Sequence, residues 1–232
     1  VMLAGIMSDV PSNLNYLKGF TFKNLQGSTG MTITKLDENS FPTDPNVMNS
    51  FNVIFMNDYD SSKLSEDQYS VLKRWVEQGG FLIIGTGPNG EKTLSVFKDD
   101  FITGIKGGSS QVPAKGLGAL AGTDFDKPID IMNIKALGGE SLVSENGVDL
   151  VQKLNKGQGG ILLLGFDMGL EPISSWNLNR YFMETLVQIA APSIYSGQYF
   201  EKYMAIGRNY TYAIDRALKN IPELPLPGYK TI

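Results

Sequence analysis

Carboxylate side chains follow three apolar segments that the sequence predicts to be strands, at residues 1–7, 51–56 and 161–166. The carboxyl ends of parallel strands meet at one edge of an open α/β sheet, and ligands bind there, so these side chains are candidates for a single site. They could bind a small molecule, hold Ca²⁺ or Mg²⁺, or share acid–base work, but each could instead cap a helix or turn. The candidates are the carboxylates of Asp9, Asp58, Asp60, Asp167 and Glu171, together with the amide of Asn57.

Thr86 lies between two glycines after a predicted strand at 81–84, and it is a further ligand-binding candidate. Gly85-Thr86-Gly87 has the outline of the turn on which several hydrolases place a nucleophile. Threonine is β-branched and poorly suited to that strained turn, and the chain has no histidine to activate its hydroxyl. We therefore expect a capping or hydrogen-bonding threonine.

The segment 85–90 also matches the glycine spacing GxGxxG of dinucleotide-binding loops. It does not open a mononucleotide-binding half, and Pro88-Asn89-Gly90 is itself a strong turn signal. A Walker phosphate loop is excluded because Glu91 lies between Gly90 and Lys92. We therefore expect a turn here rather than a nucleotide site.

Composition narrows the chemistry further, because the 232 residues include no histidine and no cysteine. Their absence removes the usual neutral-pH base, the thiolate nucleophile and the commonest zinc ligands. Any catalysis would depend on Asp, Glu, Lys, Tyr, Ser or Thr. The net charge of −4 and the scattered lysines argue against nucleic acid, whose binding needs a concentrated basic face. We predict no cofactor and no resident metal.

The clearest structural unit is a strand, a helix and a second strand over residues 51–84. Residues 51–56 form a nearly continuous apolar run, as in a parallel strand covered on both faces. Ser65 and Gln68 have the spacing of a helix capping box, and Gly79-Gly80 ends the helix before the strand at 81–84. Such crossovers join parallel strands, so the sequence predicts an open α/β sheet.

Other segments complete the expected organisation. Strands are predicted at 1–7 and 31–36, a long irregular loop at 98–128, and a β-meander formed by strands at 129–134, 141–143, 148–154 and 161–166. A helix at 177–190 closes an α/β domain spanning 1–195. Residues 196–220 are expected to form a tyrosine-rich amphipathic helix, which could bind a partner or a sugar or pack on the domain, and 221–232 a proline-rich linker.

Several of these segments resemble the class I glutamine amidotransferase-like fold, in the non-catalytic form found in ectodomains of membrane-anchored proteins of Gram-positive bacteria. The similar stretches are 5–9, 64–80, 85–87 and 165–172. The resemblance implies an open, mostly parallel, flavodoxin-like sheet with helices on both faces. It also implies a fragment excised from a longer protein, located on the extracytoplasmic face of the cell membrane and contacting the membrane only through segments outside this chain.

The same resemblance bears on activity, because the family uses a Cys, His and Glu triad. Thr86 stands approximately at the position of the Cys, Asp167 at that of the His, and Glu171 near that of the Glu. Two of the three triad residues are replaced by residues that cannot perform their roles. The resemblance therefore does not imply glutamine hydrolysis.

We expect a non-enzymatic ligand-binding or assembly domain, with an unknown small molecule or a surface protein as its partner. The alternative is a hydrolase of carbohydrate or cell-wall material that uses two of the carboxylates, which need only be roughly 5 to 9.5 Å apart. A third hypothesis is a Ca²⁺- or Mg²⁺-dependent binding module that uses the same carboxylates.

Overall fold

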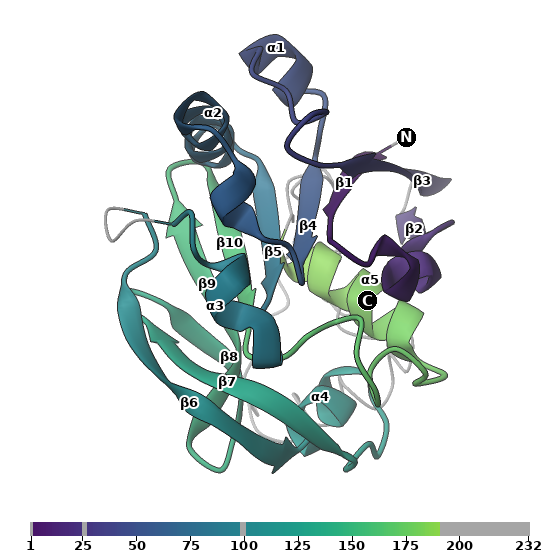
Figure 1. The fold of residues 1–232 in the computed structure, drawn as a ribbon. Coiled ribbons are helices and arrows are strands. Elements are labelled where there is room, and N and C mark those ends of the chain that lie inside the picture. Colours follow the sequence, from purple (N-terminus) through teal and green to yellow (C-terminus); the bar gives the residue numbers. More distant parts are fainter. Residues whose placement is uncertain (1, 25–26, 98–100, 191–232) are drawn as a thin grey trace, which may run out of the picture.

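The computed structural model describes residues 2–24, 27–97 and 101–190, and its main feature is an eight-stranded sheet (Figure 1). The strands of this sheet are β1 (Met2–Met7), β2 (Thr21–Asn24), β3 (Gly27–Leu36), β4 (Val53–Asn57), β5 (Phe81–Gly85), β8 (Glu140–Glu145), β9 (Val148–Lys156) and β10 (Gly159–Leu164). Their order is β2-β3-β1-β4-β5-β10-β9-β8. Neighbours from β3 to β10 pair in parallel, whereas β2, β9 and β8 join antiparallel. The predicted α/β class is confirmed, with a mixed sheet.

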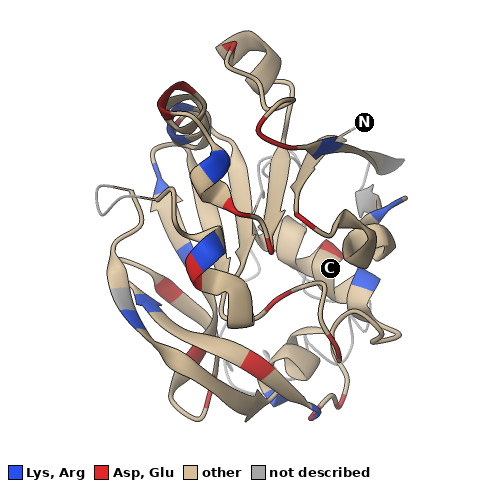
Figure 2. Ribbon diagram, viewed as in Figure 1, with Lys and Arg blue, Asp and Glu red and all other residues tan. Residues whose placement is uncertain are grey.

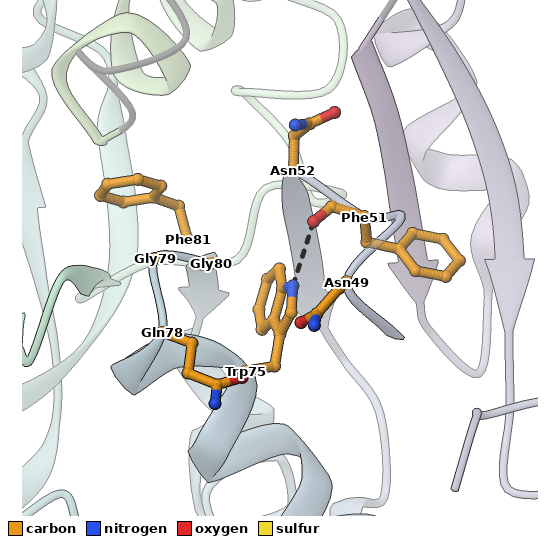
Figure 3. A pocket seen from close by; sticks show the side chains of 8 residues that line it. All are labelled: Asn49, Phe51, Asn52, Trp75, Gln78, Gly79, Gly80 and Phe81. Atoms are coloured by element: carbon orange, nitrogen blue, oxygen red, sulfur yellow. Dashed lines mark hydrogen bonds between the residues drawn. The ribbon is translucent and has the colours of Figure 1, made fainter. Parts of the chain in front are cut away.

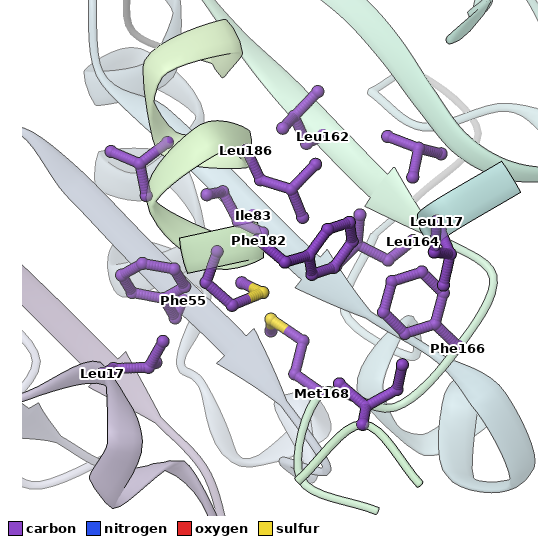
Figure 4. Packing of buried hydrophobic residues seen from close by; sticks show 14 of the residues in the cluster. Leu17, Phe55, Ile83, Leu117, Leu162, Leu164, Phe166, Met168, Phe182 and Leu186 are labelled. Atoms are coloured by element: carbon purple, nitrogen blue, oxygen red, sulfur yellow. The ribbon is translucent and has the colours of Figure 1, made fainter. Parts of the chain in front are cut away.

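Helices cover both faces of the sheet, α2 (Glu66–Glu77) on one and α5 (Asn179–Ala190) on the other (Figure 1). Successive side chains of a strand point to opposite faces, so a strand that is apolar at every position must be covered twice. In β4, Phe55 packs in the cluster that contains α5, and Met56 packs in the cluster that contains α2. Figure 4 shows the first cluster, in which side chains of α5 lie against β4, β5 and β10.

The start of α2 follows directly from its sequence. Ser65 Oγ accepts a hydrogen bond from the Gln68 backbone N–H at 3.2 Å, and Gln68 Oε1 accepts one from the Ser65 N–H at 2.9 Å. Both halves of the predicted capping box are therefore present. The buried side of the helix includes Tyr69, Leu72 and Trp75, which pack on the sheet.

The expected irregular loop at 98–128 is wrong over most of its described length. Residues Gly104–Pro113 form β6, which pairs antiparallel with β7 (Pro128–Ala136) in a separate two-stranded sheet, and Lys115–Leu120 form α4. Side chains from 106 to 111 are exposed, so this part of β6 carries no alternation of apolar residues. Its strand conformation comes from backbone pairing with β7, which composition does not reveal.

The expected β-meander is only partly right. β8, β9 and β10 form consecutive antiparallel neighbours, and β10 joins the parallel part of the sheet beside β5. β7 instead pairs with β6 and is tied to β9 by a side chain: Gln152 accepts a hydrogen bond from Ala136 N and donates one to Ile134 O, both at 2.8 Å. A period of two identifies a strand but not its neighbour.

Short helices fill the remaining connections. They are η1 (Pro11–Leu17), α1 (Pro45–Met48), η2 (Ser61–Lys63), η3 (Gly87–Asn89) and α3 (Gly90–Thr93), where η denotes a 3₁₀ helix. The helix expected at 196–220 and the linker expected at 221–232 lie outside the described residues. Within the described ranges, every helix is too short or too polar to cross a membrane.

Replacing Ser65 with alanine removes the N-cap oxygen of α2 and leaves the Gln68 N–H without its partner. We expect this change to lower the free energy of unfolding by about 1 kcal/mol. Urea denaturation followed by circular dichroism measures it. The matched control is Ser70→Ala, an exposed position inside the same helix, where alanine favours the helix and no loss is expected. Equal losses in both variants would contradict the role given to the cap.

Candidate functional site

Two aspartates and two lysines form an ion-paired cluster where β1 and β4 end. Asp9 follows β1, and its carboxylate oxygens lie 3.0 Å from Lys63 Nζ and 3.0 Å from Lys92 Nζ. Asp58 follows β4, and its Oδ1 lies 2.7 Å from the same Lys92 Nζ. Acidic and basic residues therefore meet at this edge of the sheet (Figure 2). The structure brings together the predicted candidates Asp9 and Asp58, but with their charges already paired.

A second pair of candidates, Asn57 and Asp167, forms a buried hydrogen-bond network beside this cluster. Asn57 Nδ2 donates to Asp167 Oδ1 at 2.7 Å, and Asn57 Oδ1 accepts from the Met168 N–H at 2.8 Å. The Gly169 N–H also donates to Asp167 Oδ1 at 2.7 Å. Asp167 is only 4% exposed, and among the described residues nothing hydrogen-bonds to its second oxygen, Oδ2.

The glycine at the end of β5 makes this network possible. β5 lies between β4 and β10, so the Asn57 side chain must cross it to reach Asp167. A Cβ at Gly85 would collide with Asn57 Oδ1. Gly87 has φ +69°, and a Cβ there would also meet the Asp167 backbone nitrogen at 2.9 Å. Because Gly85 and Gly87 have no side chains, the side chains of Asn57 and Asp167 can meet at the end of β5.

Thr86 itself joins β5 to the segment that follows β10. It is fully buried, its hydroxyl donates to the Leu164 carbonyl at 2.7 Å, and its N–H donates to the Phe166 carbonyl at 2.9 Å. The hydroxyl is therefore committed to a backbone acceptor and does not face solvent as a nucleophile would.

The side chains of Asp60 and Glu171 bond outside both groups, although the Asp60 backbone N–H donates to Asp9 Oδ2 at 3.2 Å. Asp60 Oδ1 accepts from the N–H and hydroxyl of Ser62 and caps η2. Glu171 accepts from the hydroxyls of Ser174 and Ser175. Both carboxylates thus bond within their own turn, as expected of the capping alternative.

The pKa values of two carboxylates move in opposite directions. Burial raises the pKa of Asp167, and the nearby charge of Asp58 adds to the rise, although hydrogen bonds from Asn57 and Gly169 oppose it. Burial also acts to raise the pKa of Asp9, but the hydrogen bonds from Lys63 and Lys92 outweigh it and the pKa falls below its usual value. Asp9 therefore stays ionised under conditions in which Asp167 takes up a proton more readily.

The backbone at Asp58 is unusual, because its φ of +47° places a non-glycine residue in the left-handed region. Its side chain is held by Lys92 and by Asn89 Nδ2 at 2.8 Å, which stabilises the turn in this conformation. Such positions cost of order 1 kcal/mol and cluster at functional sites. Among the described residues, only Asn146 shares this non-glycine positive φ, and it lies in the turn between β8 and β9.

A divalent-cation site finds little support in the geometry. In the part of the chain that the structure describes, no three Asp, Glu, His or Cys residues gather closely enough to hold a metal. The oxygens of Asp9 and Asp58 converge instead on the ammonium of Lys92, which already supplies the positive charge there.

Sequence reasoning missed Lys63, Lys92 and Asn89. Each lies on a short helix that follows a strand, η2 after β4 for the first and η3 and α3 after β5 for the others. The available signal was a lysine soon after the carboxyl end of a strand, with an aspartate after the same end of another strand.

Comparison with known proteins finds solved structures with a similar fold but no matching family. No family model and no curated protein matches the sequence. The cytoplasmic protein STM1381 from Salmonella typhimurium LT2 is 10% identical, with a TM-score of 0.57, over 82% of this chain and 100% of that one. The cytoplasmic protein STM3548 from Salmonella typhimurium is 12% identical, with a TM-score of 0.57, over 82% and 99% of the two chains.

A third structure, a catalytic mutant of the GH42 β-galactosidase Gan42B from G. stearothermophilus, matches less well. It is 12% identical, with a TM-score of 0.49, over 82% of this chain and 30% of that one. Similarity at this level says nothing about the activity of this chain.

The resemblance to class I glutamine amidotransferases is wrong, because the structures that match are two Salmonella proteins described as cytoplasmic proteins and not as amidotransferases. The stretches that suggested it contain a helix cap and strand-ending turns, which serve local folding in many α/β proteins and do not identify a family. The expected membrane-anchored protein on the extracytoplasmic face is also wrong, since both Salmonella proteins are described as cytoplasmic.

Replacing Asn57 with alanine leaves the buried Met168 N–H without an acceptor and removes a donor from Asp167. We expect a loss of about 2 to 3 kcal/mol in the free energy of unfolding, because buried polar groups lose their partners. Urea denaturation measures it. Asn89→Ala, which removes one exposed hydrogen bond to Asp58, should cost less than about 0.5 kcal/mol. An equal loss of unfolding free energy in Asn57→Ala and Asn89→Ala would show that the buried network does not stabilise the fold.

The opposite pKa shifts of Asp9 and Asp167 place their effects on stability in different pH windows. Asp9 stabilises the fold above the unfolded pKa of about 3.9, and this contribution disappears as the pH falls through its lowered folded value. Asp167 has a raised pKa, so its contribution falls as the pH rises from about 3.9 through the folded value.

We therefore expect the stability difference between wild type and Asp9→Asn to shrink below about pH 4, where the Asp9 contribution disappears. The difference between wild type and Asp167→Asn should change above about pH 4 instead. Urea denaturation from pH 2 to pH 7 measures both differences. The same pH dependence in the two variants would contradict the assignment.

Proposed function

We propose that this chain is a non-enzymatic binding or assembly domain in which the carboxyl edge of the sheet forms the binding surface. One observation carries the proposal: the hydroxyl of Thr86 and the carboxylates of Asp9 and Asp58 are bonded within the protein. The Thr86 hydroxyl donates to a backbone carbonyl, and Asp9 and Asp58 share the Lys92 ammonium. A nucleophile or base would first have to give up a partner that the fold supplies.

The strand order supports the choice of edge. The parallel strands run β3-β1-β4-β5-β10, an order that matches the flavodoxin-like pattern 2-1-3-4-5, and we infer this finer fold assignment from it. In that pattern the order in which strands are added reverses between the first and third strands, and ligands bind at their carboxyl ends. Here these strands are β1 and β4, which are followed by Asp9 and Asp58. The proposed partner is a small polar molecule or a protein.

A second candidate function is a carboxylate-dependent hydrolase. The opposite pKa shifts of Asp167 and Asp9 favour it. Acid–base pairs often consist of one carboxyl with a raised pKa and one that stays ionised, which describes Asp167 and Asp9. The left-handed conformation of Asp58 adds backbone strain of the kind found at active sites. Against it, the ion pairs of Asp9 and Asp58 leave little room for a water-activating carboxylate.

One activity screen separates the two functions. The purified chain is incubated with p-nitrophenyl acetate, a p-nitroanilide and p-nitrophenyl glycosides from pH 4 to pH 9, beside the variants Asp167→Asn and Thr86→Val. We expect no release of chromophore that depends on either residue. The control is Glu171→Gln, whose carboxylate accepts hydrogen bonds from Ser174 and Ser175 in its own turn. Turnover with a bell-shaped pH profile that Asp167→Asn abolishes and Glu171→Gln retains would establish the hydrolase instead.

A further inference from the structure

A cavity of about 590 Å³ lies at the amino edge of the sheet, opposite the carboxylate cluster. It is formed where the chain enters β4 and where α2 ends before β5, by residues that include Asn49, Asn52, Trp75 and Gln78 (Figure 3). Its volume falls within the range of roughly 300 to 1,000 Å³ typical of small-molecule sites. The cavity is large enough for a ligand of one or two sugar rings.

The wall of this cavity is rigid. Trp75 is buried, and its indole N–H donates to the Phe51 carbonyl at 3.0 Å. Gly80 lies against the face of the same ring, where any Cβ would collide with it. Asn52 joins three strands, because its Oδ1 accepts from Leu3 N at 2.9 Å and its carbonyl accepts from Phe81 N at 3.3 Å. A ligand would meet a surface that needs no rearrangement, which favours binding.

Hydrogen-bonding groups remain available around this wall. The amide side chains of Asn49 and Gln78 are exposed, and no described residue hydrogen-bonds to either. Asn52 uses its Oδ1, but its NH₂ group has no partner in the described part of the chain. In Figure 3 the Trp75 indole projects between Asn49 and Gln78, so donors and acceptors flank one apolar ring. Amides both donate and accept, which matches hydroxyl groups.

The charge of the cavity restricts its ligand. Among the described residues, no Asp, Glu, Lys or Arg lines it. The carboxyl end of α2 lies beside it at Gln78, and the carbonyls of a helix end carry partial negative charge, which disfavours an anion. A cation would lack the carboxylate needed to offset its desolvation. An uncharged molecule with several hydroxyls avoids both costs and can donate to carbonyls and accept from amides.

We propose that this amino-edge cavity binds a neutral, hydroxyl-rich small molecule of the monosaccharide or disaccharide class. The polar groups of the site are the amides of Asn49, Asn52 and Gln78, and its apolar wall is the small exposed part of Trp75, Phe51 and Phe81. It is separate from the carboxylate edge and does not depend on the function proposed for that edge. A result that overturns one of these two proposals therefore does not affect the other.

The chain's two tryptophans allow a direct test by ¹⁹F NMR of protein labelled with 5-fluorotryptophan. Trp176 packs against Phe125, with ring centroids 4.1 Å apart, in the cluster on the other face of the sheet, so it is an internal reference. A Trp176→Phe variant assigns the two resonances. On titration with glucose, N-acetylglucosamine or maltose, we expect a saturable shift of the Trp75 resonance and none of Trp176. Absence of a saturable Trp75 shift with all three sugars overturns the proposal.

Variants test the polar contacts. Asn49→Ala and Gln78→Ala remove exposed amides that bond to no described residue, so neither should disturb folding. Each is expected to weaken binding about five- to tenfold, the effect of one lost hydrogen bond. The matched control is Asn46→Ala, an exposed asparagine on α1 outside the cavity, which should leave the affinity unchanged.

Glucose 6-phosphate tests the charge argument, and it should bind more weakly than glucose because of the α2 carbonyls. Tighter binding of the phosphate, or equal weakening by Asn46→Ala and Gln78→Ala, would overturn the assignment.

Discussion

The buried hydrogen bond from Asn57 to Asp167 joins the ends of β4 and β10 across β5, and the carboxyl edge of the sheet is organised around it. It exists because Gly85 offers no side chain between the two strands. A carboxylate in this position is costly to desolvate, and Asn57 together with the Gly169 N–H supplies the compensation. The loop after β10 is thereby fixed against the rest of the edge.

The charges of this edge are distributed between a buried carboxyl and an ion-paired cluster. Asp167 is held among neutral donors, where burial raises its pKa, while Asp9 and Asp58 are paired with Lys92 next to it. Ion pairing keeps Asp9 charged but restricts its oxygens. The same chemistry that stabilises the edge therefore suits recognition better than turnover, and this underlies the function we propose.

The parts of the fold that the sequence predicted correctly are those encoded by local interactions. The capping box at Ser65 and Gln68 requires only residues three apart, and the apolar run of β4 requires cover on both faces whatever supplies it. β6 was not predictable in this way, because its exposed glycine and serine positions carry no pattern and its order comes from pairing with β7. The resemblance to an amidotransferase rested on similarly local stretches, and these did not identify a family.

By itself, the sequence determined that catalysis could not use histidine or cysteine and that carboxylates would follow the central strands. Only the tertiary structure decided what those carboxylates do. Lys92 reaches Asp9 from 83 positions away, and Asn57 reaches Asp167 from 110, so both partnerships depend on the order in which strands pair. Strand order reflects the burial of whole faces, a property of the assembled chain that no local spacing records.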